Sequence, residues 1–545
     1  MKFLKNILIV ALVAVAASGC KKLDIAPTNT FSSLTFWKVN ANVYSALNNN
    51  YSLILNSTLY FNPEAYSDNA YSPTGDLNLI ASGNANSLTG EFATDWSYYY
   101  QAIKSCNDFL ANVNQNTTLP ADTIKRLIAE TRFIRAFEHF NLTKWYGDVP
   151  IIQTDLTPDQ AKVVARSPKA DVVTFILSEL DAAIPALPTQ AQLPAGQQGR
   201  ITKGAALALE ARVLLYQGNR MADVVTVCQK LMTDPTDYGT YSLDPSYSNL
   251  FSDPNTNKNS PEVILGLEYV PTVRTWQNYW DFAPRSVGGR VSSMAPTQEL
   301  VNDYIMMNGD SINDPASGYN QSTPYINRDP RLTATIVYDK YVWNNEGSIN
   351  GPSKTIYIKP GSDPIQPGQD EYSPGSQSSS PTGYYWRKYF DPTAQASYVS
   401  GNNLLLFRYA EILLDYAEAE NALGQMNATV WNQTIGALRA RAGFTDPNAL
   451  NYPGNNNNMT TIIRRERRVE LAMEGLRTDD IRRWKIAQVV MNGYAHGAQF
   501  SGDATTDNGY IRAQKRQFNP ARDYVWAIPS GDVSLDKNLT QNPNY

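Results

Sequence analysis

The stretch ETRFIRAFEHFNLTKWYGDVPI, residues 130–151, decides how this chain folds. Its apolar side chains recur at three- and four-residue steps, and the same spacing extends upstream to Pro120-Ala121-Asp122, where a helix can begin. Gly147 to Pro150 would end that helix. The pattern predicts a long amphipathic helix through Leu142 with one broad apolar stripe: Ile124, Leu127, Ile128, Phe133, Ile134, Phe137 and Phe140.

Two later segments resemble each other. Residues 202–217 form an Ala/Leu-rich helical pattern, broken at Gly218-Asn219 and followed by an amphipathic pattern to Met232. Residues 404–423 repeat this arrangement, with a break at Gly424 and a second helix over 430–441. Small residues on the first helix of each pair allow close approach of the second, which is the logic of tetratricopeptide-like repeats.

The rest of the chain divides into segments of different residue composition and pattern. Residues 36–55 are helical in pattern, 75–90 are typical of a loop, and Asp95 can cap a helix that carries Trp96 in the core. Residues 234–400 form a loop-rich insert, with strand-like runs at 263–269 and 332–338 and a short helix at 298–306. Because this insert is rich in aromatic residues, we expect it to be ordered and functional.

The N-terminus predicts export and anchoring. Residues 1–19 have a positive start, an apolar run from Ile7 to Ala17 and the small residues Ala17-Ser18-Gly19, as in a signal peptide. Cys20 follows directly, which is the position that a lipoprotein signal acylates. Several acyl chains anchor a protein stably, whereas the apolar run is too short to span a bilayer. We therefore expect a lipid on Cys20 and a tether over residues 20–30.

Composition excludes some functions. A net charge of −5 and a pI near 5.4 argue against nucleic-acid binding, which needs a basic field. Residues 464–483 hold seven arginines but also five acids, so they predict a salt-bridged helix, with Asp479–Arg483 at pairing distance. Tyr outnumbers Phe by 33 to 17, which favours half-exposed aromatic surfaces that contact ligands.

Residue types for catalysis are sparse. His139 falls inside the Phe-rich helix, so we expect it to pack in the core, whereas His496 is predicted to lie in a loop, without a visible partner. No nucleophile elbow, zinc-protease, phosphate-loop or dinucleotide motif occurs, and no metal or cofactor is implied. Cys106 and Cys228 fit small buried hydrophobes, although exported chains also permit a disulfide between them. Two well-placed carboxylates would suffice for a glycosidase, which composition cannot forbid.

Several blocks, in order, resemble the RagB/SusD family over nearly the whole mature chain. Besides residues 130–151, they are GRITKGAALALEARVLLYQG (199–218), Pro296-Thr297 with NRDPRL (327–332), FRYAEILLDYAEAEN (407–421), IRRERRVELAMEGLRTDDIRRW (463–484) and the closing Ile528-Pro529 with QNPNY (541–545). Asn544 stands where the family usually has Gly, and Ala527 where Pro often precedes Ile-Pro, which affects backbone fit at the C-terminus alone.

The resemblance implies a mainly α-helical fold, in which a tetratricopeptide-like scaffold carries a loop-rich ligand-binding region. The N-terminal region (31–233) and the C-terminal region (234–545) would pack as one unit. It also implies a non-catalytic nutrient-uptake lipoprotein on the outer membrane, facing the cell exterior. Its partner would be a TonB-dependent transporter of the SusC type, and its ligand an oligosaccharide. A peptide or glycopeptide ligand, or a lipoprotein glycoside hydrolase, remains open.

Two loops combine flat rings with polar side chains, which is the mixture that sugar capture requires. Sugar C–H faces stack on Trp and Tyr, while hydroxyls need Asp, Asn or Arg at the rim. The first loop is 66–71 and the second is 274–290. From these loops we predict eight ligand residues, with Trp276 or Trp280 as the stacking platform: Asp68, Asn69, Tyr71, Trp276, Tyr279, Trp280, Arg285 and Arg290.

The anchor gives the first testable prediction. Mass spectrometry of the protein extracted from membranes should find acyl chains on Cys20, because the thiol follows the small residues that precede cleavage. Replacing Cys20 with Ala should release the mature chain into the periplasmic fraction, while Cys106→Ala should leave it in the membrane. An unmodified Cys20 in wild-type protein would contradict the anchor.

Overall fold

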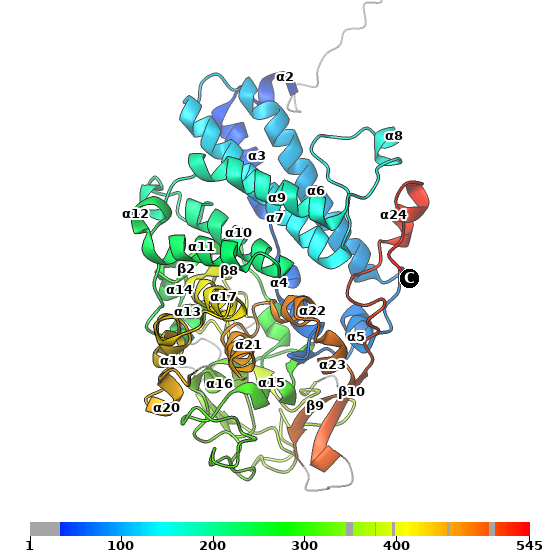
Figure 1. Cartoon of the computed structure of the whole chain (residues 1–545). Coiled ribbons are helices and arrows are strands. Elements are labelled where there is room, and N and C mark those ends of the chain that lie inside the picture. The colour runs from blue at the N-terminus through cyan, green and yellow to red at the C-terminus, as the bar shows by residue number, and fades with distance from the viewer. Residues whose placement is uncertain (1–32, 345–352, 377, 395–397, 455–457, 501–506) are drawn as a thin grey trace, which may run out of the picture.

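The computed structural model describes residues 33–344, 353–376, 378–394, 398–454, 458–500 and 507–545 (Figure 1). Cys20 lies outside these residues. Helices of the first half are α2 (Ser33–Phe36), α3 (Asn40–Ser52), α4 (Ser57–Ala65), α5 (Gly75–Ser82), α6 (Gly90–Asn112), α7 (Ala121–Tyr146), α8 (Pro158–Ala161), α9 (Lys169–Ala183), α10 (Lys203–Gln217) and α11 (Met221–Thr233).

The second half has shorter helices between long connections. They are α12 (Pro235–Tyr238), α13 (Tyr247–Ser252), α14 (Pro254–Asn259), α15 (Gln298–Asp303), α16 (Pro330–Thr335), α17 (Tyr409–Ala422), α18 (Ala428–Gln433), α19 (Ile435–Ala442), α20 (Pro447–Leu450), α21 (Met459–Glu470), α22 (Arg477–Arg483), α23 (Ala487–Val490) and α24 (Ser530–Leu535).

Within the described residues, the strands pair only in twos, all antiparallel. The pairs are β1 (Ala70–Tyr71) with β3 (Ala295–Pro296), β2 (Val263–Leu267) with β8 (Leu404–Arg408), β4 (Ile336–Val337) with β7 (Tyr385–Trp386), β5 (Tyr341–Trp343) with β6 (Lys354–Ile356), and β9 (Gly493–Gln499) with β10 (Tyr510–Arg516).

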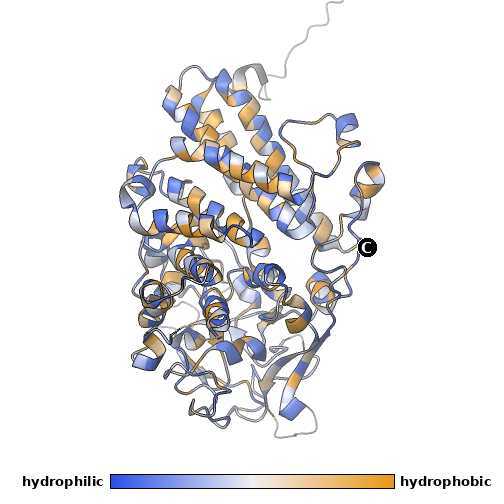
Figure 2. Ribbon diagram, in the orientation of Figure 1, coloured by the Kyte–Doolittle hydropathy of each residue, from blue (hydrophilic) through white to orange (hydrophobic). Residues whose placement is uncertain are grey.

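Packed helix pairs form the scaffold, as predicted. Helix α7 contacts α6 and α9, α10 contacts α11, and α17 lies against both α11 and α21. Figure 2 shows their apolar residues (orange) on the sides that face one another. Seventeen residues of α7 are buried, including its whole central aromatic run. The long helix predicted from residue 121 is therefore α7, a central element that continues to Tyr146, and the prediction of a mainly helical fold is confirmed.

Tertiary pairing changes several local predictions. Residues 75–90 contain α5, and Asp95 lies buried inside α6 instead of capping it, since that helix begins at Gly90. Residues 404–408 form β8 because they pair with β2, so the helix predicted from 404 begins at Tyr409. The helix predicted over 430–441 is interrupted at Thr434, between α18 and α19.

Buried single residues behave as predicted. Trp96 is in the core, and Cys106 and Cys228 are both free and fully buried, so they form no disulfide with each other. His139 is fully buried, and its Nδ1 lies 2.8 Å from the carbonyl oxygen of Arg135. The imidazole also packs edge-on against Phe175. Its role is packing and hydrogen bonding.

A group of buried ion pairs joins the scaffold to the loop-rich region. Glu470, the last residue of α21, accepts hydrogen bonds from Arg331 at 2.8 Å, from Arg408 at 2.7 Å and from Arg441. These arginines lie on α16, at the end of β8 and on α19. None of the four side chains is more than 4% exposed. Burial alone would raise the pKa of Glu470, but the three guanidiniums hold it well below its usual range.

The same network extends to other acids, so its charges are compensated. Arg408 also donates to Glu262 at 2.7 Å and to Glu474 at 2.8 Å, and Glu474 accepts from Lys388 at 2.6 Å. The residues predicted to form one salt-bridged helix are thus α21, a turn and α22. Asp479 pairs with Lys144, and Arg483 pairs instead with Asp480 and Glu418.

Glu470→Gln tests the network, because it keeps the size of the side chain and removes its charge. We expect a loss of about 3–5 kcal/mol in the free energy of unfolding, the usual cost of breaking a buried pair. Urea denaturation would measure it. Asp223→Asn is the matched control, since its pair with Arg220 is about half exposed and should contribute under about 1 kcal/mol. Equal losses would contradict the network's role.

Candidate ligand-binding site

The first predicted loop lies inside the fold. Asp68 is 4% exposed, and its carboxylate accepts hydrogen bonds from Arg477 at 2.8 and 2.9 Å, with Arg468 at 3.0 Å. Burial alone would raise the pKa of Asp68, but the two arginines hold it well below its usual range. Asn69 is also buried, donating to Glu64 at 2.9 Å and accepting from Arg468 at 2.8 Å.

This buried loop supports two elements that do reach the surface. Thr297, which caps α15, donates its hydroxyl to the carbonyl of Asp68 at 2.6 Å and its N–H to that of Asn69 at 2.9 Å. Arg516 on β10 donates to the carbonyls of Ser67 and Ala70 at 2.8 and 2.7 Å. The loop therefore fixes α15 relative to the β9–β10 hairpin.

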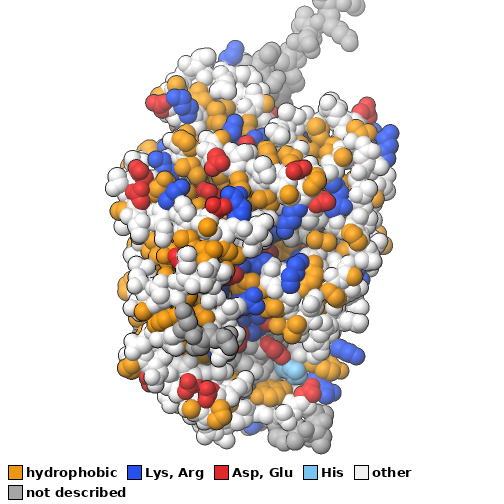
Figure 3. Space-filling model, viewed as in Figure 1, with side chains coloured by type: hydrophobic (Ala, Val, Ile, Leu, Met, Phe, Trp, Pro, Cys, Tyr) orange, Lys and Arg blue, Asp and Glu red, His pale blue; other side chains and the backbone are white. Residues whose placement is uncertain are grey.

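A pocket of about 340 Å³ lies between α15 and the hairpin, and we call it the hairpin pocket. Figure 3 shows a surface histidine (pale blue) next to acidic (red) and basic (blue) side chains at the lower right of this face. The lining is almost wholly polar: Gln298, Glu299, Asn302, His496, Asp507, Asn508 and Tyr510.

His496 links the two walls of the hairpin pocket. Its Nδ1 lies 2.7 Å from the Glu299 carboxylate on α15, and its Nε2 lies 3.3 Å from Asp507 beside the hairpin. The prediction that His496 is in a loop without a partner was wrong, because β9 brings it to residues distant in sequence. The hydrogen bond to Glu299 raises the pKa of His496.

The hairpin pocket can offer oriented amides to a ligand. Gln298 is fixed by Tyr384, whose hydroxyl donates to it at 2.6 Å, and it donates in turn to Asn302 at 2.7 Å. Tyr510 adds a half-exposed ring at the wall. Amide groups beside an aromatic ring suit a ligand with many hydroxyls.

In the second predicted loop, two of the three rings are in the core. Trp276 is 3% exposed, donates its indole N–H to the carbonyl of Asn402 at 2.8 Å and packs on Phe61. Tyr279 is 1% exposed and donates to the carbonyl of Trp386 at 2.6 Å. Neither ring has a face available for a sugar. Trp276 and Tyr279, like Asp68 and Asn69, were predicted to contact the ligand. That prediction was wrong, because all four side chains are buried and support the fold.

The other four predicted residues keep exposed surface. Trp280 is half-buried, with the guanidinium of Arg290 lying 4.5 Å from its ring centre. Arg290 is held there by two hydrogen bonds to Asp281, at 2.7 and 2.8 Å. Arg285 is exposed, and Tyr71 is half-buried on β1. Residues 290–303 run from Arg290, beside Trp280, through β3 into α15, which lines the hairpin pocket.

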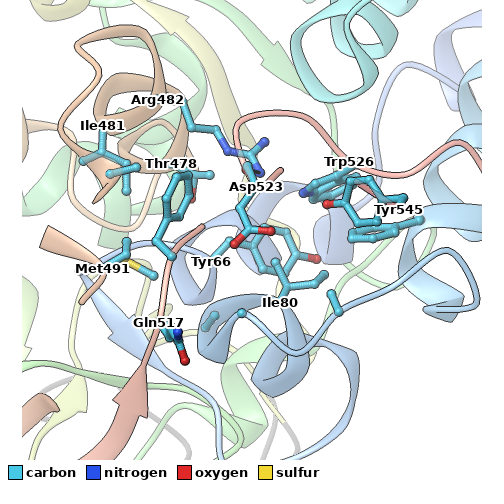
Figure 4. Close-up of a pocket in the computed structure, with 16 residues that line it drawn as sticks. Tyr66, Ile80, Thr478, Ile481, Arg482, Met491, Gln517, Asp523, Trp526 and Tyr545 are labelled. Atoms are coloured by element: carbon cyan, nitrogen blue, oxygen red, sulfur yellow. Dashed lines mark hydrogen bonds between the residues drawn. The ribbon is translucent and has the colours of Figure 1, made fainter. Parts of the chain in front are cut away.

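A second, enclosed cavity is too small for a sugar. It has a volume of about 30 Å³ between α5, α22 and the C-terminus, where Arg482 points toward Asp523 beside Trp526 and Tyr545 (Figure 4). Arg482 donates to the carbonyl of Asp523 at 3.0 Å, while its other terminal nitrogen and the indole N–H of Trp526 find no acceptor in the described part of the chain. Such a space suits about one ordered water.

Two family models match this chain. The one described as the SusD family matches residues 261–545, and the one described as "Starch-binding associating with outer membrane" matches residues 21–215. The chain belongs to the SusD family. The resemblance noted from sequence blocks is thereby confirmed.

Similar proteins extend over the whole length of this SusD-family chain. SusD-like protein P2 of Formosa agariphila is 23% identical, with 100% of both chains covered. The crystal structure of a SusD-like carbohydrate binding protein from Bacteroides fragilis is 28% identical, with a TM-score of 0.82, and the match covers 93% of this chain and 100% of that one. A laminarin binding SusD-like protein (23% identical, TM-score 0.63, covering 93% and 100%) shares the fold.

Sequence reasoning missed the hairpin pocket. Glu299 is far in the chain from His496 and Asp507, and only the approach of α15 to the hairpin makes them neighbours. One signal was available: Asn508-Gly509, followed by the alternation of residues 510–516, is typical of a strand that leaves a turn. Among the described residues, no helix is both long enough and apolar enough to cross a bilayer.

The two histidines allow a direct test, because they should titrate on opposite sides of pH 6.5. Burial lowers the pKa of His139 to about 4, whereas Glu299 raises that of His496. Proton NMR of the imidazole resonances should show both midpoints. Glu299→Gln should lower that of His496 alone, and the control Glu210→Gln, on α10, should change neither.

The free energy of unfolding should also depend on the His496–Glu299 pair. The pKa of His496 is raised in the folded state. The contribution of the His496–Glu299 pair to the free energy of unfolding is therefore fully present below about pH 6.5, and it is lost as the pH rises through the folded-state pKa. Unchanged midpoints in Glu299→Gln would contradict the pairing.

Proposed function

We propose that this protein is an outer-membrane lipoprotein that binds oligosaccharide at the cell surface and delivers it to a SusC-like TonB-dependent transporter, without catalysing a reaction. Membership of the SusD family is the observation that carries the proposal. The name of the second family model and that of the Bacteroides fragilis neighbour support outer-membrane association and carbohydrate binding. Acylated Cys20 would hold the chain at the membrane.

Trp280 is the proposed stacking platform. A half-exposed indole presents an apolar face to sugar C–H groups, and Arg290 is already oriented beside it by Asp281. Arg285 and Tyr71 would contact the glycan at the rim. The amides of Gln298 and Asn302 in the hairpin pocket would then bind hydroxyls further along the chain of sugars.

Hydrolysis at the hairpin pocket is disfavoured by its electrostatics. A glycosidase needs one carboxyl with a raised pKa to protonate the leaving oxygen. Here hydrogen bonds from Arg512 and His496 lower the pKa of Asp507 to about 2, so this carboxylate stays ionised. Glu299 is occupied by His496. The pocket therefore supports binding and not acid catalysis.

Affinity electrophoresis against a panel of polysaccharides tests this function. At least one glycan should retard the wild-type protein, and no reducing ends should be released. Trp280→Ala should weaken binding about tenfold, or about 1.4 kcal/mol, through loss of the stacking face. Tyr238→Ala, a half-exposed aromatic on α12, should bind as wild type. Release of reducing ends would indicate a hydrolase, and binding of peptides alone would indicate the other ligand class.

A further inference from the structure

A further hollow lies on the helical scaffold, away from the loop-rich insert. It has a volume of about 350 Å³ and is bounded by the α10–α11 turn, α17, α21 and the residue after α22. We call it the scaffold groove, and the lining residues that matter are Gln217, Glu418, Asn421, Arg464, Arg483 and Trp484. Its size is at the lower end of the range for small-molecule pockets, about 300–1,000 Å³.

One acid in the scaffold groove is fully neutralised. The two carboxylate oxygens of Glu418 accept from Arg483 at 2.5 and 2.7 Å, and one of them also accepts from the indole N–H of Trp484 at 2.7 Å. The remaining nitrogen of Arg483, Nε, donates to Asp480 at 2.9 Å. These side chains form a rigid wall and leave no charge to offer a ligand.

Arg464 differs from every other group in this wall. Its guanidinium lies 4.7 Å from the ring centre of Trp484, yet among the described residues it makes no hydrogen bond and no ion pair. Burial and the positive charges of Arg483 and Arg477 lower its pKa, against the opposing effect of Glu418. A guanidinium nevertheless stays charged and carries five N–H donors.

Two side-chain amides that can accept hydrogen bonds from hydroxyl groups line the same groove as the Arg464 guanidinium. Gln217 donates its amide N–H to Val213, and Asn421 donates to Thr460, but within the described residues no donor reaches either side-chain carbonyl oxygen. Both amides line the scaffold groove. A ligand here would therefore meet one cationic fork and two oriented acceptors.

The surrounding face is also positive. Lys485 comes directly after Trp484, and Lys169 lies at the start of α9. Burial and the charge of Lys485 lower the pKa of Lys169, against the opposing effect of Asp479 and Asp148, while burial and Arg482 lower the pKa of Lys485. Figure 3 shows Lys and Arg side chains (blue) across the centre of this face. Because the whole chain carries −5, such a surface is a local reversal of charge.

We infer that the scaffold groove binds a hexuronate unit of an acidic glycan, with Arg464 as the fork for its carboxylate and Gln217 and Asn421 as acceptors for its hydroxyls. The inference rests on the proposed function and names a substrate class for it. A peptide strand fits less well, because the walls are helices whose backbone groups are already paired, so the groove has no sheet edge to extend.

Isothermal titration of the full chain with an oligoglucuronate and with the matching neutral gluco-oligosaccharide tests the inference. Arg464→Gln should weaken oligoglucuronate binding at least tenfold and leave any binding of the neutral oligomer unchanged. Arg464→Lys keeps the charge but loses the paired donors of the guanidinium, so its affinity for oligoglucuronate should lie between those of the wild type and Arg464→Gln. Arg220→Gln is the control, because it removes one positive charge beside the groove and should change affinity less than twofold.

The outcomes separate the two proposals. If the polysaccharide panel retards the wild type but Arg464→Gln binds oligoglucuronate as wild type does, the inference fails and glycan binding stands. If the wild type binds no glycan, both fail. Binding of a Glu-rich peptide that is lost in Arg464→Gln, with no uronate binding, would overturn the inference in favour of a protein partner. Circular dichroism would confirm that each variant is folded.

Discussion

The fold depends on pairing Glu470 with three arginines that come from different parts of the chain. Arg331, Arg408 and Arg441 belong to the loop-rich insert, a strand end and a late helix, and all converge on the end of α21. Charges at this depth are tolerated only when each has its partner. The network therefore permits essentially one arrangement of scaffold and insert, which hydrophobic contacts alone would specify less strictly.

The positions of both candidate binding surfaces follow from that arrangement. Helix α21 also carries Arg468, which contacts Asp68, Asn69 and Asp303, so the same helix places the loop beneath α15. Four residues earlier on the same helix, Arg464 lies against Trp484, and no acceptor among the described residues binds its guanidinium. Helix α21 thus carries Arg468, whose three nitrogens all donate hydrogen bonds inside the fold, and Arg464, whose guanidinium lines a hollow and is available to a ligand.

The two surfaces also differ in chemistry. The hairpin pocket balances its acids with His496 and Arg512, and its amides are the groups left to meet a neutral, hydroxyl-rich ligand. The scaffold groove balances its one acid with Arg483 and keeps a further cation. A glycan carrying both neutral and acidic units would find complementary partners on both surfaces.

The sequence by itself determined the helical scaffold and the family, because helix periodicity, caps and signature blocks are local properties. Residues 121–142 and 202–232 became helices as predicted, and His139 and Trp96 entered the core. The sequence could not show that Trp276 is buried while Trp280 is half-exposed, or that Asp68 lies inside the fold. Composition marks a loop as aromatic and polar without showing which side chains face inward. Tertiary structure decided those cases. Burial, and the pairing of charges hundreds of residues apart, depends on which elements meet in space, and that information is absent from any local window of the chain.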